Sequence, residues 1–334
     1  MFQQISNSIE NTPFFGSAAF GIIAMVIVGS SWCLTGLVMG DAPKKGVEAS
    51  LVQLFGAAFS AAVSLIILFA TSAYSTASLP ATFLTCLAYF VACMMNFVML
   101  QLMSQAMQCG PNGIVWAIIQ SAMVFPFLGG ILFFDVRFTL LRGAGIVLLL
   151  TALVLFALAK DNSRSSGGRW KLLAFAGLAI TAVQQNLTMM PSYFEAAQGV
   201  PSILRALAAA AGTFTMAVLW ELPRLDRARR EKLRSGMKNP VLWKYVAALQ
   251  FFNLLFAYAL FYPGMNVMAR AGMGGMCYPM MVGSCIVSFT LASIWLLKEK
   301  LRPVQAAALA ICIAGLVLIC TKLRKIPEKV RKGA

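Results

Sequence analysis

Ten long apolar stretches, separated by short polar links, account for most of the chain. Each is about as long as the ~20-residue helix that crosses a bilayer's ~30 Å hydrocarbon core. Inside that core the backbone finds no water, so a crossing segment must be a helix whose hydrogen bonds close internally. The pattern predicts an all-α integral membrane protein. We place its ten transmembrane helices at 15–39, 50–71, 81–106, 113–134, 140–159, 171–190, 202–220, 241–262, 276–297 and 302–321.

Composition supports this interpretation and excludes several function classes. Hydrophobic residues make up 60% of the chain, charged residues only 11%, and mean hydropathy is +0.81, which excludes a soluble protein. The links are too short for a soluble catalytic domain, so we expect no enzyme and no catalytic residue. The chain has no histidine, and its eight cysteines show no metal-binding spacing. We therefore expect neither a metal nor a cofactor.

Two parts of the sequence resemble each other. Asp135 and Glu299 each follow an apolar helix and precede a basic residue and a small-residue segment. Leu-Val-Leu then occurs at 153–155 and again at 316–318, an offset of 163 positions, near half of the 334 residues. This similarity predicts a duplicated five-helix unit. The alternative, two unrelated helix pairs that look alike, stays open.

An odd number of helices in each unit would place the second copy upside down in the membrane. Inverted repeats of this kind are common in transporters, with the ligand held near mid-bilayer between the copies. We predict a first five-helix repeat over 1–160 and a second over 161–334.

The distribution of basic residues predicts the orientation. Of the 27 Lys and Arg, 17 follow odd-numbered predicted helices. The positive-inside rule places these links in the cytoplasm and both termini outside, although the basic C-terminal tail, 322–332, argues the other way. We expect a multi-pass protein of the bacterial inner (plasma) membrane. A basic run at 227–234 is typical of a segment beside the membrane that touches anionic lipid headgroups. It has no aromatic platform, so we expect no nucleic-acid partner.

Polar side chains inside the predicted helices are amides, indoles and hydroxyls rather than charges. They fall in helices one, three and four and in helices six, eight and nine, which are equivalent pairs under the repeat. We predict that these six helices line a central cavity and that helices five and ten are peripheral. Predicted substrate-binding residues are Trp32, Asn96, Trp116, Gln120, Gln185, Gln250 and Asn253. Further mid-helix polar residues are Ser30, Ser31, Gln184, Asn186, Ser284 and Ser288.

The chemistry of this set suggests the cargo. Amides supply donors and acceptors for neutral hydroxyls, and indoles supply a flat surface for the C–H face of a sugar. Membrane bundles also use amides to join helices, and that structural role is the alternative for each of these residues.

Two charged residues lie close to the start of the seventh predicted helix. Glu195 lies in the link before it and Arg205 about one turn inside it. Arg205 is expected to reach the interface with its charged end, a common behaviour of long basic side chains. Pairing with Glu195 is a second possibility. The functional alternatives make Glu195 a proton-coupling acid and Arg205 a clamp for an anionic group.

Ten helices, two five-helix repeats and acid-containing turns before helices five and ten resemble the drug/metabolite transporter superfamily. Within it, the segment PSYFEAAQGVPS, 191–202, is similar to the link between helices six and seven in the L-rhamnose–proton symporter family. Leu297-Lys298-Glu299 also resembles the Leu-Lys-Glu that closes helix nine there. The resemblance implies ten helices and proton-coupled sugar uptake.

These observations predict a secondary transporter that takes up a small polar metabolite, a rhamnose-like sugar, by proton-coupled alternating access. Its expected partners are that substrate, protons and membrane lipids, and a homodimer is allowed. The alternative is an exporter of amino acids or related metabolites, in which Arg205 would meet a carboxylate. A third reading, a scaffold or lipid-handling protein, predicts a dry interior with its amides paired helix to helix.

Overall fold

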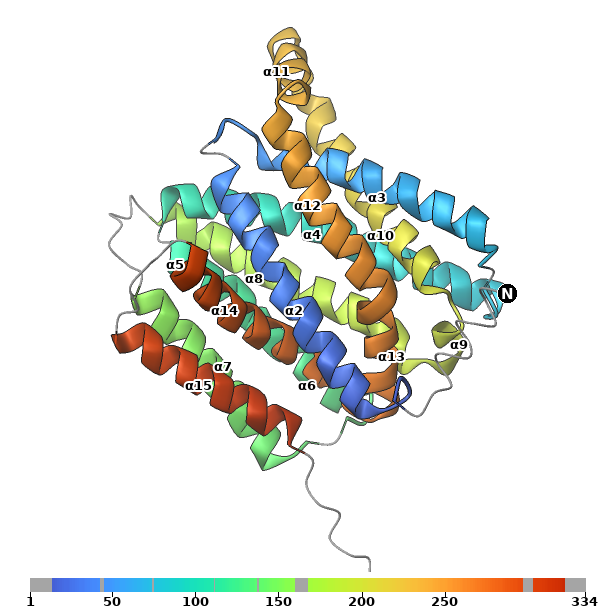
Figure 1. Cartoon of the computed structure of the whole chain (residues 1–334), viewed down its shortest axis with the longest axis vertical. Helices are drawn as coiled ribbons and strands as arrows, with labels where there is room; N and C mark the ends of the chain where they lie inside the picture. Colours follow the sequence, from blue (N-terminus) through green and yellow to red (C-terminus); the bar gives the residue numbers. More distant parts are fainter. Residues whose placement is uncertain are drawn as a thin grey trace, which may run out of the picture.

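The computed structural model describes residues 14–42, 45–73, 75–110, 112–136, 138–159, 168–296 and 303–321. Within these residues the secondary structure is helical without strands, and ten spans are long and apolar enough to cross a membrane (Figure 1). The predicted all-α, multi-pass membrane protein is therefore confirmed. The spans, numbered 1 to 10, are Ala18–Met39, Ala49–Thr71, Leu79–Cys109, Ile114–Phe133, Leu140–Leu158, Arg169–Tyr193, Ser202–Arg224, Pro240–Arg270, Gly274–Ala292 and Pro303–Cys320.

Five spans are single α-helices: α2 (Ala18–Asp41), α3 (Ala49–Thr71), α4 (Leu79–Cys109), α7 (Leu140–Ala159) and α15 (Pro303–Cys320). The others combine an α-helix with a shorter turn. Span 4 is α5 (Asn112–Gln120), η2 (Ser121–Met123) and α6 (Val124–Phe133), and span 6 is α8 (Arg169–Met189) with η3 (Met190–Tyr193). Span 7 is α10 (Ser202–Glu221) with η4 (Leu222–Arg224), and span 9 is η6 (Gly274–Met276) with α14 (Cys277–Leu296).

Span 8 differs most from its predicted extent, because the sequence prediction ended at residue 262, before Pro263. It continues from α12 (Pro240–Phe256) through a π-helical turn, η5 (Ala257–Phe261), into α13 (Tyr262–Arg270). Pro263 lacks an N–H and would interrupt a regular helix. Here it is the second residue of α13, and Tyr262 alone separates it from the wider turn. Such π turns often mark functional positions in helices.

Side chains cap the starts of several helices. Ser17 accepts a hydrogen bond from the Phe20 N–H, and Asn239 accepts one from the Val241 N–H. These bonds satisfy amides that have no partner within the helix.

Helices α7 and α15 lie at one edge of the bundle, where helices five and ten were predicted to be peripheral (Figure 1). They also pack along each other, which the sequence analysis did not predict. Their backbones meet at two glycines: a Cβ on Gly145 would lie 2.8 Å from the Gly315 carbonyl oxygen. Small residues allow such close crossings, which stabilise helix pairs in lipid through van der Waals contact. At the opposite edge, α3 packs on α10.

The interior packs around methionine-rich contacts of spans 1, 8 and 9. Met25, Met268 and Met281 are fully buried in the largest apolar cluster. Gly29 of α2 crosses α14 so closely that an added Cβ would overlap the backbone of Met281. Unbranched methionine side chains can fill the irregular gaps left by such crossings.

The link between spans 7 and 8 contains a helix of its own, α11 (Arg227–Met237), which the sequence analysis treated only as a charged segment. Asp226 caps its N-terminus by accepting a hydrogen bond from the Arg229 N–H. In Figure 1, α11 projects beyond the neighbouring ends of the bundle.

Some predictions fall on positions outside the described residues. These are Glu299 and the Leu297-Lys298-Glu299 match, the boundary between the two predicted repeats at 160/161, and both chain ends.

Candidate functional site

A cavity of about 340 Å³ lies inside the bundle. Its volume is within the range of roughly 300–1,000 Å³ that is usual for small-molecule sites. Residues of spans 1, 2, 3, 4, 6, 7, 8 and 9 line it, whereas none of spans 5 and 10 does. The six helices expected to line a cavity all contribute, and the two expected to be peripheral lie outside it. Spans 2 and 7 are additional.

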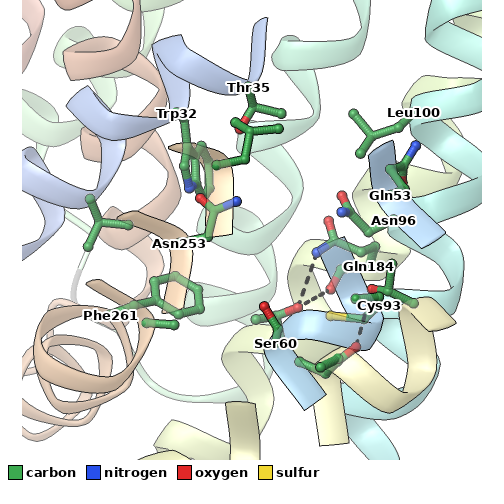
Figure 2. A pocket seen from close by; sticks show the side chains of 18 of the residues that line it. Trp32, Thr35, Gln53, Ser60, Cys93, Asn96, Leu100, Gln184, Asn253 and Phe261 are labelled. Carbon is green, nitrogen blue, oxygen red and sulfur yellow. Dashed lines mark hydrogen bonds between the residues drawn. The ribbon is translucent and has the colours of Figure 1, made fainter. Parts of the chain in front are cut away.

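The structure brings together every residue predicted to bind the substrate. Figure 2 shows labelled side chains of the cavity wall that come from separate helices and surround one space. The predicted residues on the wall are Trp32, Asn96, Trp116, Gln120, Gln185, Gln250 and Asn253.

Several of these amides have no hydrogen-bond partner among the described residues. This is the case for the side chains of Asn96, Gln120 and Asn253, and for the Oε1 atom of Gln185, which is buried. For the buried Gln185, an unpaired acceptor costs about 1–3 kcal/mol, whereas Asn96, Gln120 and Asn253 are only partly buried. Water or a polar ligand in the cavity can supply the missing partners.

Other amides on the wall are held in place by neighbours. Gln250 accepts a hydrogen bond of 2.5 Å from the Ser60 hydroxyl, which joins span 8 to span 2. Gln184 donates to the Thr188 hydroxyl at 3.3 Å within α8. These contacts orient part of the wall.

Sequence reasoning missed the contribution of spans 2 and 7, namely Gln53, Ser60 and Thr213. Gln53 is 7% exposed, and neither its Nε2 nor its Oε1 atom has a partner among the described residues. It lies one turn into α3, so its position in the sequence looks like the membrane interface. The spacing of Gln53 and Ser60, seven residues apart on one helix face, was the available signal.

Four residues in the predicted polar set lie off the wall: Ser30, Asn186, Ser284 and Ser288. Asn186 donates to the Ala182 carbonyl of its own helix at 2.8 Å. The Ser284 hydroxyl donates to the Met280 carbonyl at 2.7 Å, also within its helix. Hydroxyls often bond the preceding helical turn in this way, so a mid-helix serine is weak evidence for a cavity.

No Asp, Glu, Lys or Arg side chain lines the cavity among the residues that the structure describes. The wall is instead neutral and polar, with aromatic surfaces from Trp32, Trp116, Tyr89, Tyr262 and Tyr278. This combination can bind hydroxyl groups and apolar ring faces together. It offers no side chain of opposite charge to a charged ligand.

The expectation that the charged end of Arg205 reaches the interface is wrong, because its side chain is fully buried. Nε donates to the Val200 carbonyl at 3.0 Å, one terminal nitrogen to the Ala197 carbonyl at 2.8 Å, and the other to Asn266 Oδ1 at 3.1 Å. These acceptors replace water around the guanidinium, which permits burial.

Two aromatic rings separate Arg205 from the cavity. Tyr89 and Tyr262 line the cavity, and each ring centroid lies about 6 Å from the Arg205 guanidinium carbon (5.9 and 6.0 Å). The rings pack edge to face, 5.0 Å apart. The guanidinium therefore joins the link between spans 6 and 7 to span 8, behind this aromatic layer.

Glu195 contacts neither the cavity nor the Arg205 guanidinium. It is exposed, begins the short helix α9 (Glu195–Gln198) and is not on the cavity wall. The structure gives it no ion pair with Arg205.

Comparisons with known proteins give a fold but no family. No protein-family model matches the sequence, and no curated protein matches it either. Among solved structures, a crystal structure described only as a protein superposes with a TM-score of 0.64. The match covers 91% of this chain and 96% of the other at 14% identity. At that identity the likeness shows a shared fold alone.

Proposed function

We propose that the protein is a secondary transporter that takes up a small neutral polar metabolite, a sugar or similar polyol, through the central cavity. The observation that carries this proposal is a cavity wall rich in unpaired amides and aromatic rings and free of charged side chains among the described residues. Hydroxyl groups satisfy amide donors and acceptors without bringing a charge into the membrane. The resemblance to sugar–proton symporters agrees with this cargo.

The other two functions fit the same observations less well. A carrier for amino acids would benefit from a cation facing the cargo, but the Arg205 guanidinium lies behind Tyr89 and Tyr262 with three protein acceptors. A scaffold would hold its amides in helix-to-helix pairs, whereas several here face a cavity unpaired. We therefore retain the sugar carrier alone.

Alternating access between two inverted five-helix halves is part of the proposal, and the packing of the spans supports it. The second half should repeat the contacts of the first, so each span should correspond to the span numbered five higher or lower. Under this correspondence, three pairs of packed spans become other packed pairs: 1–9 becomes 6–4, 3–6 becomes 8–1, and 3–7 becomes 8–2. Spans 2 and 7 pack together, as do spans 5 and 10, and each of these pairs maps onto itself. A two-fold axis relating the halves would produce this set of contacts.

Proton coupling is the remaining part of the proposal. Because no carboxylate lines the cavity among the described residues, a coupling acid would act from outside it. Glu195 is our candidate, since α9 contributes the Ala197 carbonyl that Arg205 binds. Uptake should then depend on an inward proton gradient.

The test uses purified protein with a panel of sugars, polyols and amino acids, measured by ligand-induced thermal shift and by uptake into proteoliposomes. We expect a sugar or polyol to stabilise the protein and to enter the vesicles. Gln120→Leu should weaken that ligand's binding about tenfold, equivalent to about 1.4 kcal/mol, because it removes an unpaired amide from the wall.

Asn186→Leu is the matched control, because this amide lies off the wall and bonds its own helix. It should leave ligand affinity unchanged. Stabilisation and transport by amino acids alone, with every sugar and polyol inactive, would refute the proposal.

A further inference from the structure

A second pocket, of about 490 Å³, lies at the end of the molecule where spans 1, 3 and 7 finish. Its walls come from the segment entering α3, the last turns of α4, the end of α10 with η4, and α11. None of its lining residues also lines the central cavity. All four walls meet where the apolar spans end, which is where the lipid headgroups lie if the spans cross a bilayer.

One wall is a polar stripe on α4. Its members recur at i, i+3, i+4 and i+7, so they share one face of the helix: Gln101, Ser104, Gln105 and Gln108. Gln101 is 7% exposed, and its Nε2 atom has no acceptor among the described residues. An unpaired buried amide donor in a polar pocket indicates a ligand that brings acceptors.

The facing wall is basic. The Arg224 guanidinium carbon lies 4.4 Å from the centre of the Trp220 ring, in a cation–π contact, and no ion pair occupies it among the described residues. Arg229 and Lys232 lie nearby, and both pair with Glu48, at 2.6 and 2.5 Å. They neutralise the one carboxylate on the pocket wall. The pocket therefore has a net positive charge, with Arg224 available.

The third wall adds backbone donors. Ala49 and Ser50 begin α3, where the first amides have no partner within the helix. The positive end of a helix dipole favours an anion at this position. The start of α3, Arg224 and Gln101 therefore all favour an anion in the same pocket.

We propose that this pocket binds the phosphate-bearing headgroup of an anionic membrane lipid. Arg224 would meet the phosphate charge, while the amide stripe and the start of α3 donate hydrogen bonds to its oxygens and to headgroup hydroxyls. Basic pockets between transmembrane helices bind anionic headgroups in this manner. The exposed arginines of α11 attract such lipids without selecting among them, whereas the pocket combines charge with directed donors.

The experiment measures the thermal unfolding midpoint of the full chain in detergent micelles. Phosphatidylglycerol, phosphatidylcholine or inorganic phosphate is added in separate samples. We expect phosphatidylglycerol to raise the midpoint by several degrees and phosphatidylcholine to have little effect. An equal rise with inorganic phosphate would overturn the lipid assignment, because it would indicate a site for free anions.

Variants distinguish binding in the pocket from general attraction of anionic lipids to the basic residues at this end of the molecule. Arg224→Gln and Gln101→Leu should each remove half or more of the rise caused by phosphatidylglycerol. Arg230→Gln is the matched control, since it removes the same charge from an exposed residue of α11 outside the pocket. Equal losses in Arg224→Gln and Arg230→Gln would refute the proposal. Arg224 is exposed, so its variant is expected to fold.

Discussion

Arg205 shows how one residue can be charged, buried and structurally decisive at the same time. Its guanidinium supplies hydrogen bonds to the Ala197 and Val200 carbonyls and to Asn266. Sequence alone could not predict this arrangement, because two acceptors are backbone carbonyls and the third lies 61 residues away. A basic residue one turn into an apolar helix gives the same pattern whether it is buried or reaches the interface.

Replacing Arg205 should therefore destabilise the protein. Arg205→Met leaves two carbonyls and an amide without their donor, and we expect a loss of about 2–4 kcal/mol in the free energy of unfolding. Arg230→Met, at an exposed position on α11, should change it by no more than about 0.5 kcal/mol. Denaturation in mixed micelles measures both variants, and equal stability of the two would contradict this assignment.

At the scale of elements, apolar length predicted all ten spans, because membrane thickness leaves little choice of structure. The internal details of the spans were less predictable. The π turn in span 8 precedes Pro263, and the sequence gives no signal for its wider hydrogen bonding. Helix α11 is rich in charged residues and has few apolar ones, of which Leu233 packs against an apolar cluster. The mid-span amides largely predicted which helices reach the cavity. Gln53 was missed because it lies near a helix end, and its seven-residue spacing from Ser60 was the one signal that placed it on the cavity face.

Helix crossings give a prediction at this scale. Gly29→Ala places a methyl group against the backbone of Met281 in α14, and such overpacking costs about 1–3 kcal/mol. Gly36→Ala lies seven residues along the same helix, where the added Cβ would meet only the Trp116 ring at 3.8 Å. It should be neutral or stabilise by about 0.5–1 kcal/mol. Thermal unfolding compares them, and an unaffected Gly29→Ala protein would show that α2 and α14 cross less closely.

At the scale of the whole molecule, contacts far apart in sequence join the two parts of the chain. At the end where spans 1, 3 and 7 finish, Arg229 pairs with Glu48 and Glu221, and Lys232 also pairs with Glu48. Burial alone would raise the pKa of Glu48, but hydrogen bonds from Lys232 and Arg229 outweigh it and lower the pKa. Glu48 belongs to the link before α3, whereas its partners belong to α11.

This cluster predicts how stability depends on pH. A lowered pKa in the folded state means that the contribution of Glu48 is complete above the ordinary carboxyl pKa of about 4.3 and is lost as the pH falls through the folded value. Glu48→Gln should lower the unfolding midpoint at pH 7 and reduce its fall on acidification. Glu231→Gln is the control, because Glu231 and its partner Arg227 are 73% and 96% exposed. Parallel pH profiles for wild type and Glu48→Gln would contradict the prediction.

The absence of charged side chains from the described cavity wall has an electrical consequence. The membrane field acts on charge, at about 2.3 kcal/mol per elementary charge per 100 mV. A neutral sugar crossing through this wall would carry no current by itself. Any current recorded during uptake would then be carried by the coupled ions. The ratio of the charge moved to the amount of sugar moved would give the coupling stoichiometry.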